Sequence, residues 1–388
     1  MTEMKKKVKL RIGIVFNFRK GWHGGIIYII NIINSLNFLE EIDRPEVVVF
    51  YNTDLEEYLK DMKYAHITFV PWVFPQFYKG YITTWLTRKN VFIEDQIEQY
   101  SLDGIYPVND RPIAGSKKIT AKVIAWLPDV QHKFYPHFFG KTRVFLREWR
   151  FKLILKNTND LVVSSADVKS HFHKFYAIKK GLRIHTLKFV SIINDFSFPP
   201  FEELKAKYAV PSKYFIVSNS FTNHKNHFVI LKALSLLKNK KPDLHFVFTG
   251  KMEFKGNEAY IKKIREMVNE NGLEHFVSFL GVIPRYDQLG LMKNSIAVVQ
   301  PSLFEGWSTV IEDAKSLQVP VIASDLPVNM EQLGDKGIYF SRENEQELAK
   351  ALYDFSPGND KLLYSNYEER VQEFAKAFIN IFKKDGAI

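Results

Sequence analysis

Residues 300–317 read QPSLFEGWSTVIEDAKSL and join an apolar, strand-like run to a helical pattern. The strand is predicted to end at Gln300 and the helix to begin near Ser308. Such a loop lies at the carboxyl end of a strand, which is the edge where open parallel sheets bind ligands. Helix-start amides suit a phosphate, and the carboxylate of Glu305 suits the hydroxyls of an attached sugar. The stretch therefore indicates an α/β fold with a site for a sugar phosphate.

The same alternation of short apolar runs and helical patterns extends through most of the chain, as in βα units on parallel sheets. The first series of predicted strands is 8–17, 46–51, 66–70, 122–127, 160–164 and 183–190. The second series is 214–219, 244–249, 276–280, 296–300, 319–323 and 337–340. Residues 71–112 are aromatic and irregular, and their prolines are predicted to break any long element there. The proline pair in residues 194–200 places a domain boundary between the two series.

The chain has 388 residues, of which 46% are apolar and 25% charged, and none is cysteine. This composition excludes whole-chain disorder, disulfide frameworks and thiolate chemistry. The net charge of +11 suits an anionic partner, which is nucleic acid, an acidic membrane surface or a phosphorylated substrate. The longest apolar stretch, residues 25–39, is too short to cross a membrane, and the N-terminus lacks a signal cleavage site. A soluble protein is expected.

Several common cofactor motifs are missing from the sequence. It has no G-x-G-x-x-G, no G-x-x-x-x-G-K-[ST], no H-E-x-x-H and no D-x-D. Dinucleotide oxidoreductases and P-loop NTPases are therefore excluded. Close histidine pairs occur at His171/His173 and His224/His227, and such histidines more often belong to a core or a surface than to a metal site. No metal ligand is predicted.

The order Pro301-Ser302-x-x-Glu305-Gly306, with an acid eight residues after Glu305, resembles the E-x7-E region of family 4 retaining glycosyltransferases. The resemblance covers the second series of strands, about half of the chain. It implies the GT-B fold, an α/β architecture of two Rossmann-like domains facing a cleft. The implied domains are an acceptor-binding domain at 1–195, a nucleotide-sugar-binding domain at 196–365 and a C-terminal helix at 366–388 that returns to the first domain.

The resemblance also implies roles for residues near Glu305. Glu305 would contact the donor-sugar hydroxyls, and Asp313 would hold the nucleotide ribose, although the family usually has Glu there. Val282 would contact the base through its backbone. The other donor-binding residues implied in this region are Gly306, Trp307, Ser308 and Thr309. Three alternatives stay open: Glu305 is an ordinary helix-start acid, Glu312 holds the ribose instead, or Glu312 forms a capping box with Thr309.

Residues 218–227, SNSFTNHKNH, follow another predicted strand and resemble the family's phosphate-binding segment. Lys225 matches the family's lysine, but Ser220 stands where most members have arginine. A diphosphate leaving group carries about two negative charges, whereas a helix terminus offers only about half a positive one. Lys225 is therefore predicted to be catalytic, with donor contacts from Ser220 and from a protonated His224. The alternative is a solvated lysine at a helix start.

Two motifs of the first domain resemble family segments as well. Gly24 and Gly25 lie in a glycine loop after the first strand, where a phosphate or sugar can approach the backbone closely. A plain turn is the alternative. The run Trp126-Leu-Pro-Asp129-Val-Gln-His132 resembles a W-x-P-D-x-Q-H segment of a bacterial subset of the family. Asp129 and His132 are predicted to orient donor or acceptor hydroxyls, with a structural cap at the strand end as the alternative.

By this resemblance the protein is a metal-independent, retaining hexosyltransferase that needs no cofactor. The donor would be a nucleoside diphosphate sugar, such as a GDP-mannose-like one, and a diphosphate oxygen would take the acceptor proton. The acceptor would be a glycan or a lipid-linked sugar in bacterial surface polysaccharide or lipopolysaccharide synthesis. The alternatives are a sugar-nucleotide epimerase or another non-transferase GT-B enzyme, and a basic nucleic-acid-binding protein. Nucleic acid is not expected as a partner, because no short segment concentrates the basic residues.

The basic stretch 141–156 interleaves Arg143, Arg147 and Arg150 with apolar residues. A basic amphipathic helix of this kind can lie on an anionic membrane surface. The alternative is a helix packed on the core with a solvated basic face. The expected location is cytoplasmic, with peripheral attachment to the inner face of the cell membrane if the helix binds lipid.

Overall fold

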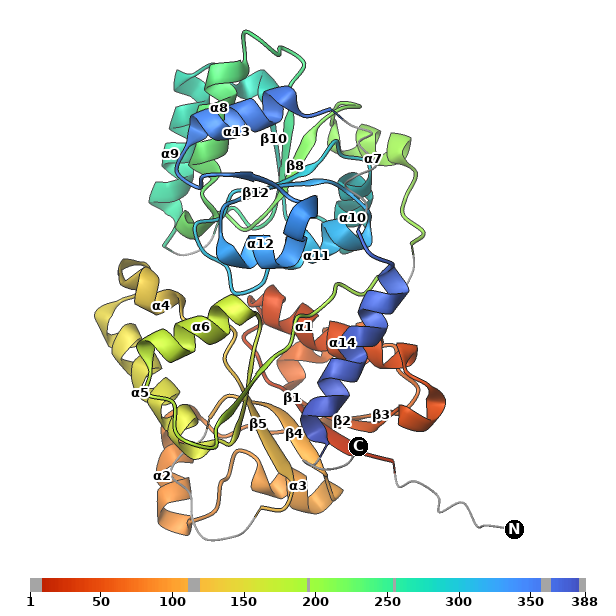
Figure 1. Cartoon of the computed structure of the whole chain (residues 1–388), viewed down its shortest axis with the longest axis vertical. Helices are drawn as coiled ribbons and strands as arrows, with labels where there is room; N and C mark the ends of the chain where they lie inside the picture. Colours follow the sequence, from red (N-terminus) through yellow and green to blue (C-terminus); the bar gives the residue numbers. More distant parts are fainter. Residues whose placement is uncertain (1–8, 111–118, 194–195, 254–255, 357–363, 384–388) are drawn as a thin grey trace. The chain divides into compact units, whose positions relative to one another are not determined.

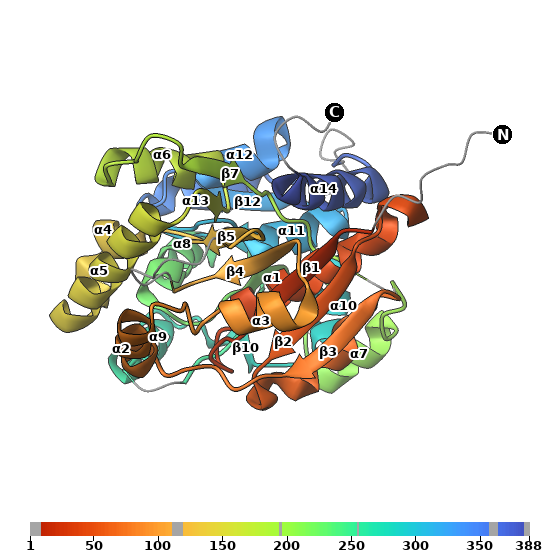
Figure 2. The same ribbon diagram turned by 90° about the horizontal axis from the view of Figure 1, so that it is seen from below.

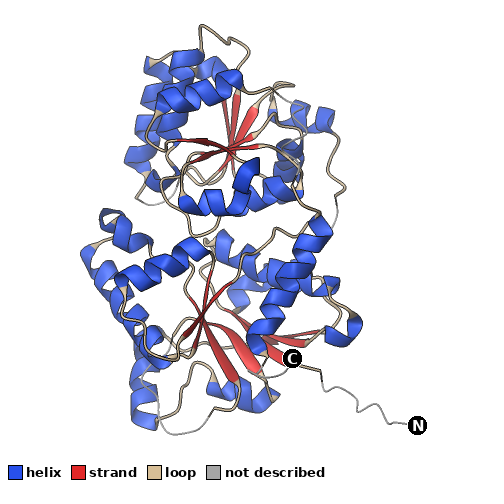
Figure 3. Ribbon diagram, in the orientation of Figure 1, coloured by secondary structure: helices blue, strands red, loops and turns tan. Residues whose placement is uncertain are grey.

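The computed structural model describes residues 9–110, 119–193, 196–253, 256–356 and 364–383. The chain forms two units, of which unit 1 comprises residues 1–192 and 366–388 and unit 2 comprises residues 193–365. The first boundary between the units follows residue 192, whereas the sequence predicted a boundary after residue 195. The second boundary precedes residue 366, which is the predicted start of the C-terminal helix segment. In each unit, helices cover a central sheet (Figure 3).

Unit 1 contains a parallel sheet of seven strands in the order β3-β2-β1-β4-β5-β6-β7. The strands are β1 (Arg11–Phe16), β2 (Glu46–Tyr51), β3 (Ile67–Pro71), β4 (Gly104–Val108), β5 (Lys122–Trp126), β6 (Asp160–Val163) and β7 (Arg183–Thr186). Figure 2 shows them side by side. All the strands except β4 coincide with predicted ones, because short apolar runs are typical of parallel strands covered on both faces.

The prolines in residues 71–112 were predicted to break any long element, and residues 72–110 form shorter elements. They contain β4 and two helices, α2 (Phe77–Thr87) and α3 (Glu94–Tyr100). β4 lies between β1 and β5, and all of its residues are buried. Pro107 stands where the register between β4 and β5 shifts. A proline is tolerated in a sheet at such an irregularity, since no ladder hydrogen bond is required of it there.

The last helix of the chain belongs to unit 1. The helices of this unit, besides α2 and α3, are α1 (His23–Ser35), α4 (Gln131–Phe134), α5 (Lys141–Asn157), α6 (Ala166–Phe175) and α14 (Tyr367–Phe382). α14 packs against α1 (Figure 1). The ring of Phe378 lies 5.6 Å from that of Tyr106 in β4. A Cβ atom on Gly104 would come within 2.4 Å of the Phe382 ring, so glycine permits this close approach.

Unit 2 contains a parallel sheet of six strands in the order β10-β9-β8-β11-β12-β13. The strands are β8 (Phe215–Ser218), β9 (Phe246–Thr249), β10 (Val277–Gly281), β11 (Val298–Gln300), β12 (Val321–Ser324) and β13 (Ile338–Phe340). All six match the predicted series. The helices are α7 (Phe201–Tyr208), α8 (His227–Leu237), α9 (Glu258–Glu270), α10 (Arg285–Lys293), α11 (Thr309–Ser316), α12 (Pro327–Leu333) and α13 (Glu345–Asp354).

Alternate residues of the unit 2 strands face opposite sides of the sheet, as the two-residue period of a strand requires. Phe215 and Val217 of β8 pack with α8, α9 and α13, whereas Ile216 packs with α7, α10 and α11. The chain runs outward from β8 to β9 and β10 and then returns to β11 on the other side of β8. The strand order therefore reverses between β8 and β11, and such a switch point forms a crevice at the carboxyl ends of the strands.

The helices of both units are too short or too polar to cross a bilayer. This statement covers every helix within the residues that the structure describes.

Candidate functional site

The switch point of unit 2 brings the two motifs around Lys225 and Glu305 together. Lys225 follows β8 and Glu305 follows β11, and Lys225 Nζ donates a hydrogen bond to Glu305 Oε1. Gln300 Nε2 donates to the same carboxylate oxygen at 2.9 Å. The Gln300 Oε1 atom accepts from Asn219 Nδ2 at 2.8 Å. Glu305 is thus held by a cation and by an amide that is itself fixed from the neighbouring strand.

Both loops are also joined through their backbones, since Leu303 N donates to His224 O at 2.7 Å. The side chains of Lys225 and Glu305 are largely buried, with 18% and 10% of their surface exposed. A cation and a carboxylate in contact at a sheet edge offer a donor for phosphate oxygens and an acceptor for hydroxyls. This arrangement excludes the solvated-lysine alternative, and it sets Glu305 apart from an ordinary helix-start acid.

The loop after β8 depends on a glycine in the neighbouring strand connection. Gly250 has a φ of +129°, and a Cβ atom there would lie 2.3 Å from Asn219 O. Gly250 N donates to Gly281 O at 2.7 Å. Only glycine allows the backbones after β8 and β9 to approach this closely. The position of Asn219, and through it Gln300 and Glu305, therefore rests on Gly250.

The histidines near Lys225 behave differently from one another. The Nδ1 atom of His224 lies 3.2 Å from Thr222 Oγ1. His227 is buried, stacks on the Phe221 ring at 4.1 Å and places Nδ1 3.1 Å from the Tyr260 hydroxyl. Burial, and then the nearby charge of Lys225, lower the pKa of His227 to about 3. His227 is therefore a neutral core histidine. Ser220, in contrast, is exposed.

The start of α11 differs from the predicted capping box. Ser308 is the N-cap, and its Oγ accepts from Ile311 N at 3.3 Å. The Ser308 amide donates to Gln332 Oε1 at 2.9 Å, so this amide is occupied. Trp307 and Ser308 are buried, whereas Gly306 and Thr309 are partly exposed. The capping box of Thr309 with Glu312 was wrong, because the helix begins one residue earlier than that motif needs.

The acids of α11 are both buried and both bonded within unit 2. Glu312 Oε1 accepts from Lys315 Nζ and from Gln332 Nε2, each at 3.1 Å. Asp313 is held in a two-pronged contact, since Arg285 NH1 donates to Oδ2 at 2.7 Å and NH2 donates to Oδ1 at 2.5 Å. The Asp313 side chain is 3% exposed and that of Arg285 is 34% exposed. Arg285 therefore presents more surface to a ligand than Asp313 does.

Arg285 was missed by the sequence analysis, although a signal for it exists. It opens α10, where a cation opposes the helix dipole unless a carboxylate compensates it. Burial acts to lower the pKa of Arg285, but the charge and hydrogen bonds of Asp313 raise it. Val282, in the loop just before Arg285, has an exposed side chain. Arg285 and Val282 thus lie on the same connection between β10 and α10.

In unit 1, Asp129 and His132 are bonded to α5. Asp129 Oδ1 accepts from Gln131 N and from Arg147 NH2, each at 2.9 Å. His132 is 1% exposed, and its Nε2 lies 2.5 Å from Glu148 Oε1. Burial lowers the pKa of His132. These contacts favour the structural alternative, in which both side chains fix the turn after β5, and they add Glu148 as a residue that the sequence did not single out.

The glycine loop of unit 1 is shaped by an aromatic stack. Trp22 stacks on Trp126 with ring centroids 5.5 Å apart, and Trp126 stacks on Tyr28 at 4.4 Å. A Cβ atom on Gly25 would lie 2.8 Å from the Trp22 ring, whereas Gly24 has space around it. Gly25 is therefore required by the Trp22 ring, and Gly24 is the more accessible of the two.

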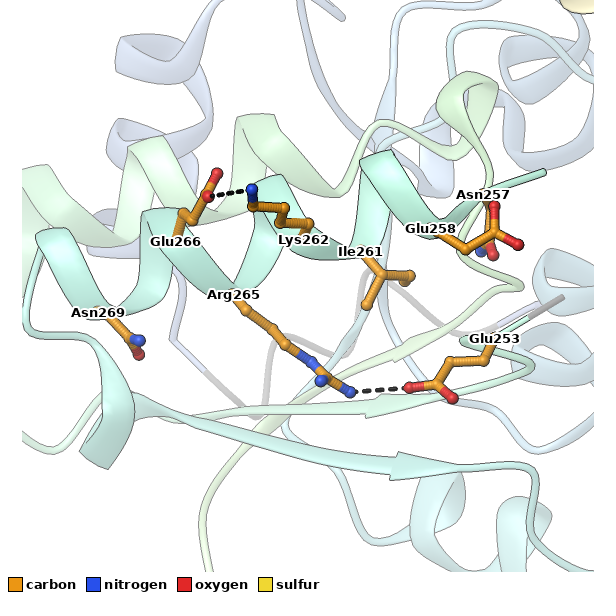
Figure 4. A pocket seen from close by; sticks show the side chains of 8 residues that line it. All are labelled: Glu253, Asn257, Glu258, Ile261, Lys262, Arg265, Glu266 and Asn269. Carbon is orange, nitrogen blue, oxygen red and sulfur yellow. Dashed lines mark hydrogen bonds and ion pairs between the residues drawn. The ribbon is translucent and has the colours of Figure 1, made fainter. Parts of the chain in front are cut away.

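A surface hollow on unit 2 does not include any predicted site residue. Figure 4 shows its lining on α9 and the preceding loop. The residues are Glu253, Asn257, Glu258, Ile261, Lys262, Arg265, Glu266 and Asn269. Arg265 pairs with Glu253 and Lys262 with Glu266, so these charges compensate one another. Within the residues that the structure describes, no three or more metal-ligating side chains come together in a group.

Comparison with known proteins concerns mainly unit 2. Residues 200–376 match the family described as Glycosyl transferases group 1. This region therefore resembles the group 1 glycosyltransferases. The resemblance inferred from the Glu305 and Lys225 motifs is thereby confirmed. Lys225, Arg285, Glu305 and Asp313 lie inside the group 1 region, whereas Asp129 lies outside it.

Relatives and solved structures agree with this resemblance of unit 2 to the group 1 glycosyltransferases. The chain is 25% identical to the O-antigen chain mannosyltransferase RfbU of Salmonella typhimurium over 246 residues, 62% of this chain and 63% of that protein. It spans less than two thirds of the length of the curated relatives that it matches, from 38% to 65%.

Two solved structures resemble the chain over almost its whole length. A glycosyltransferase from Rickettsia africae has a TM-score of 0.64 at 16% identity, covering 97% of this chain and 96% of that one. HepE of Anabaena, solved in complex with UDP and glucose, has a TM-score of 0.63 at 19% identity, covering 96% and 97%. At such identities the likeness concerns the fold. With the two parallel-sheet units, it confirms the predicted GT-B fold class.

Proposed function

We propose that this protein transfers a hexose from a nucleoside diphosphate sugar to a glycan or lipid-linked acceptor in bacterial surface polysaccharide synthesis. The observation that carries the proposal is the contact of Lys225 with Glu305 at the switch point of unit 2, inside the group 1 region. The similarity to RfbU, an O-antigen chain mannosyltransferase, supports a polysaccharide setting and a mannose-type donor. The likeness to HepE, whose structure contains UDP and glucose, supports a nucleoside diphosphate sugar.

The Lys225–Glu305 pair suits a site that exchanges partners when the donor binds. In the free protein each charge compensates the other. A diphosphate approaching Lys225 competes for its ammonium hydrogens, because phosphate oxygens are strong charged acceptors. Glu305 is then released to accept hydrogen bonds from the sugar hydroxyls, while Gln300 keeps its carboxylate in place. We therefore assign Lys225 to the leaving group and Glu305 to the sugar.

The reaction proposed is retaining and needs no added base. The bond between the anomeric carbon and the diphosphate oxygen breaks, and the acceptor hydroxyl oxygen bonds to that carbon on the same face. The hydroxyl proton passes to the departing diphosphate oxygen. The protein then contributes positioning and stabilisation of the leaving group by Lys225. Metal independence and the absence of a cofactor are part of this proposal.

The remaining assignments rest on position in the sequence and on exposure. His224, the exposed Ser220 and the partly exposed Gly306 border the Lys225–Glu305 pair in sequence and are proposed to contact the donor. Gly24 is proposed to contact the donor, and Asp129 is proposed to orient donor or acceptor hydroxyls. A location on the cytoplasmic side, where nucleotide sugars are made, follows from the same proposal.

A thermal-shift panel with GDP, UDP, dTDP and CMP sugars, with and without EDTA, tests the proposal. A ligand at 100 times its dissociation constant stabilises a protein by about 2.7 kcal/mol, which raises the midpoint by several degrees. We expect one diphosphate sugar to produce this shift, with EDTA having no effect. Lys225→Met should abolish the shift, and Lys232→Met, at an exposed lysine of α8, should keep it. No shift with any donor would contradict the proposal.

A further inference from the structure

The Lys225–Glu305 pair has no net charge of its own, since one ammonium contacts one carboxylate. The ligand proposed for it is a diphosphate, whose phosphate groups are anionic near neutral pH. Ser220 stands where the resemblance placed an arginine in most members of the family, and it adds no cation. An anion in a partly buried site is costly unless other charges compensate it. A second cation is therefore needed at the same edge of the sheet.

Arg342 lies just after β13 and is bonded to the loop that carries Lys225. Its backbone oxygen accepts from Asn226 Nδ2 at 2.8 Å, and Asn226 directly follows Lys225. Asn226 is the N-cap of α8, a position where an asparagine side chain usually bonds to the helix amides. It makes no such capping bond here and holds the backbone of Arg342 instead. The loops after β8 and β13 are thereby joined.

The side chain of Arg342 is bonded to the loop after β12. Arg342 Nε donates to Asp325 Oδ1 at 2.8 Å, and NH2 donates to Asp325 O at 3.1 Å. Ser324, the residue before Asp325, donates through Oγ to Ser302 O at 2.6 Å. Ser302 belongs to the loop that carries Glu305. The guanidinium is thus fixed to a strand end that is itself bonded to the Glu305 loop.

The guanidinium of Arg342 keeps donors that Asp325 does not use. An arginine has five N–H donors, and Asp325 accepts from Nε and from one hydrogen of NH2. Within the described ranges of the chain, NH1 has no hydrogen-bond partner. The outer edge of the guanidinium, formed by NH1 and the second NH2 hydrogen, is therefore able to donate to two phosphate oxygens. The side chains of Arg342 and Asp325 are 32% and 36% exposed, so a ligand can reach them.

Two other cations near these loops are less available. Arg285 uses both NH1 and NH2 on Asp313, whose carboxylate is almost wholly buried. Lys315 Nζ donates to the carboxylate of Glu312, which is also buried. Releasing either cation would leave a buried carboxylate without its partner. Arg342, in contrast, is able to bind a ligand while it keeps its own carboxylate partner.

We propose that Arg342 binds the diphosphate of the donor together with Lys225 and supplies the second cation of the site. This role rests on the proposed function, since it requires a nucleoside diphosphate sugar as donor. The planar fork of the guanidinium matches two phosphate oxygens. Its charge stabilises the negative charge that develops on the departing diphosphate, and the contact with Asp325 holds the fork in position before the donor binds.

Titration calorimetry in the presence of EDTA tests this role. The probes are UDP, GDP, dTDP and CDP, and the tightest binder is compared with its own nucleoside. Arg342→Gln should weaken binding of that diphosphate on the order of 10- to 100-fold, because it removes charged hydrogen bonds. The nucleoside should bind equally to both proteins, whereas a displaced loop would weaken both ligands. Arg265→Gln is the matched control, since Arg265 also pairs with an exposed carboxylate of unit 2, and it should bind as the wild type does.

A second variant adds the charge back at another position. Ser220→Arg, introduced into the Arg342→Gln protein, places a cation in the loop after β8 and should recover about tenfold in affinity for the diphosphate. Unchanged thermal midpoints show that the variants are folded. Wild-type affinity in Arg342→Gln would overturn the role of Arg342 and leave the proposed function standing. A loss confined to Lys251→Met would do the same and assign the second cation to the exposed lysine after β9. No binding of any diphosphate by the wild type would overturn the proposed function, and the role of Arg342 with it.

Discussion

Lys225 Nζ and Glu305 Oε1 form an ion pair although the two residues are 80 positions apart in the chain. Their proximity arises from strand order, because β8 and β11 are neighbours in the sheet and both loops leave at the carboxyl edge. The chain completes β9 and β10 between them. The contact places one cation and one carboxylate at the switch point, where they are able to bind different parts of one ligand.

The coupling between these two residues is the first prediction. Lys225→Met leaves the largely buried carboxylate of Glu305 without its cation, and Glu305→Gln leaves the ammonium of Lys225 without its carboxylate. Each variant should lower the unfolding free energy by about 1–3 kcal/mol. The double variant should cost less than the sum by about 1–2 kcal/mol. Urea unfolding of unit 2 in the four proteins measures this coupling. Strictly additive losses would show that the pair contributes no interaction energy in the free protein.

The second prediction concerns Arg285 and Asp313. Asp313→Asn should destabilise the protein by about 2–4 kcal/mol, because the partly buried guanidinium loses its charged partner. Replacing both residues, Arg285→Met with Asp313→Leu, should recover much of the loss. Denaturant midpoints measure both effects. If the double variant is less stable than Asp313→Asn, the contact between Arg285 and Asp313 stabilises the fold by more than the mutual compensation of two charges.

The predicted ribose contact of Asp313 is tested with the same variant. The carboxylate is almost wholly buried, and both of its oxygens accept from Arg285. We therefore expect Asp313→Asn to weaken the binding of a nucleoside diphosphate and of its 2′-deoxy form equally. Calorimetric titration of both ligands gives the ratio of their dissociation constants. If the wild type prefers the nucleoside diphosphate over its 2′-deoxy form and the variant binds both equally, Asp313 is the ribose ligand.

The third prediction is that Gly250→Ala disturbs the site from a distance. The new methyl group would meet Asn219 O at 2.3 Å, and the φ of +129° is unfavourable for alanine. Together these should cost about 2–3 kcal/mol. Gly256→Ala is the control, because Gly256 has a φ of +98° with open space around it. Equal losses in the two variants would mean that backbone strain, and not the clash, determines the cost.

The fourth prediction is a pH dependence from His227. Its pKa is about 3 in the folded protein, mainly because of burial, and about 6.5 in an unfolded chain. Between these values the unfolded chain binds a proton that the folded one does not. Stability is therefore complete above about pH 6.5 and falls as the pH drops toward 3, by up to about 1.4 kcal/mol per unit.

Replacing the imidazole isolates this contribution. His227→Gln should fall less steeply than the wild type in unfolding free energy between pH 6.5 and pH 4.5. His275→Gln, which removes an exposed histidine, should keep the wild-type slope. Denaturant titrations at each pH provide the comparison. Parallel curves for the wild type and His227→Gln would exclude His227 as the titrating group.

The sequence predicted the strands well because parallel strands buried on both faces are uninterrupted apolar runs. It missed β4, since a proline such as Pro107 within a short run argues against a central strand. It also missed that α2 turns Trp85 and Leu86 outward, because helical periodicity shows that a helix has an apolar side but not which way that side points. Burial against Phe92, through Gly80, decides the orientation.

The candidate site was predictable only in part, because its motifs are local in the sequence whereas its contacts depend on the tertiary structure. Motifs after β8 and β11 are local, so Lys225 and Glu305 were identified separately. The partners that hold them, and the contact between Arg285 and Asp313, depend on which strands and helices become neighbours. The predicted role of His132 in contacting a hydroxyl did not allow for Glu148 and Tyr176, which surround its imidazole in the fold.

The membership of α14 in unit 1 affects how the protein is made. α14 begins 181 positions after β7 ends, and it buries Phe374, Phe378 and Phe382 in the first unit. At roughly 5–20 residues per second, a ribosome needs about 10–35 s to synthesise the intervening chain. During that time the nascent first unit has all seven strands but not the helix that covers part of its core. Unit 1 therefore completes its folding only after the whole of unit 2 has been synthesised.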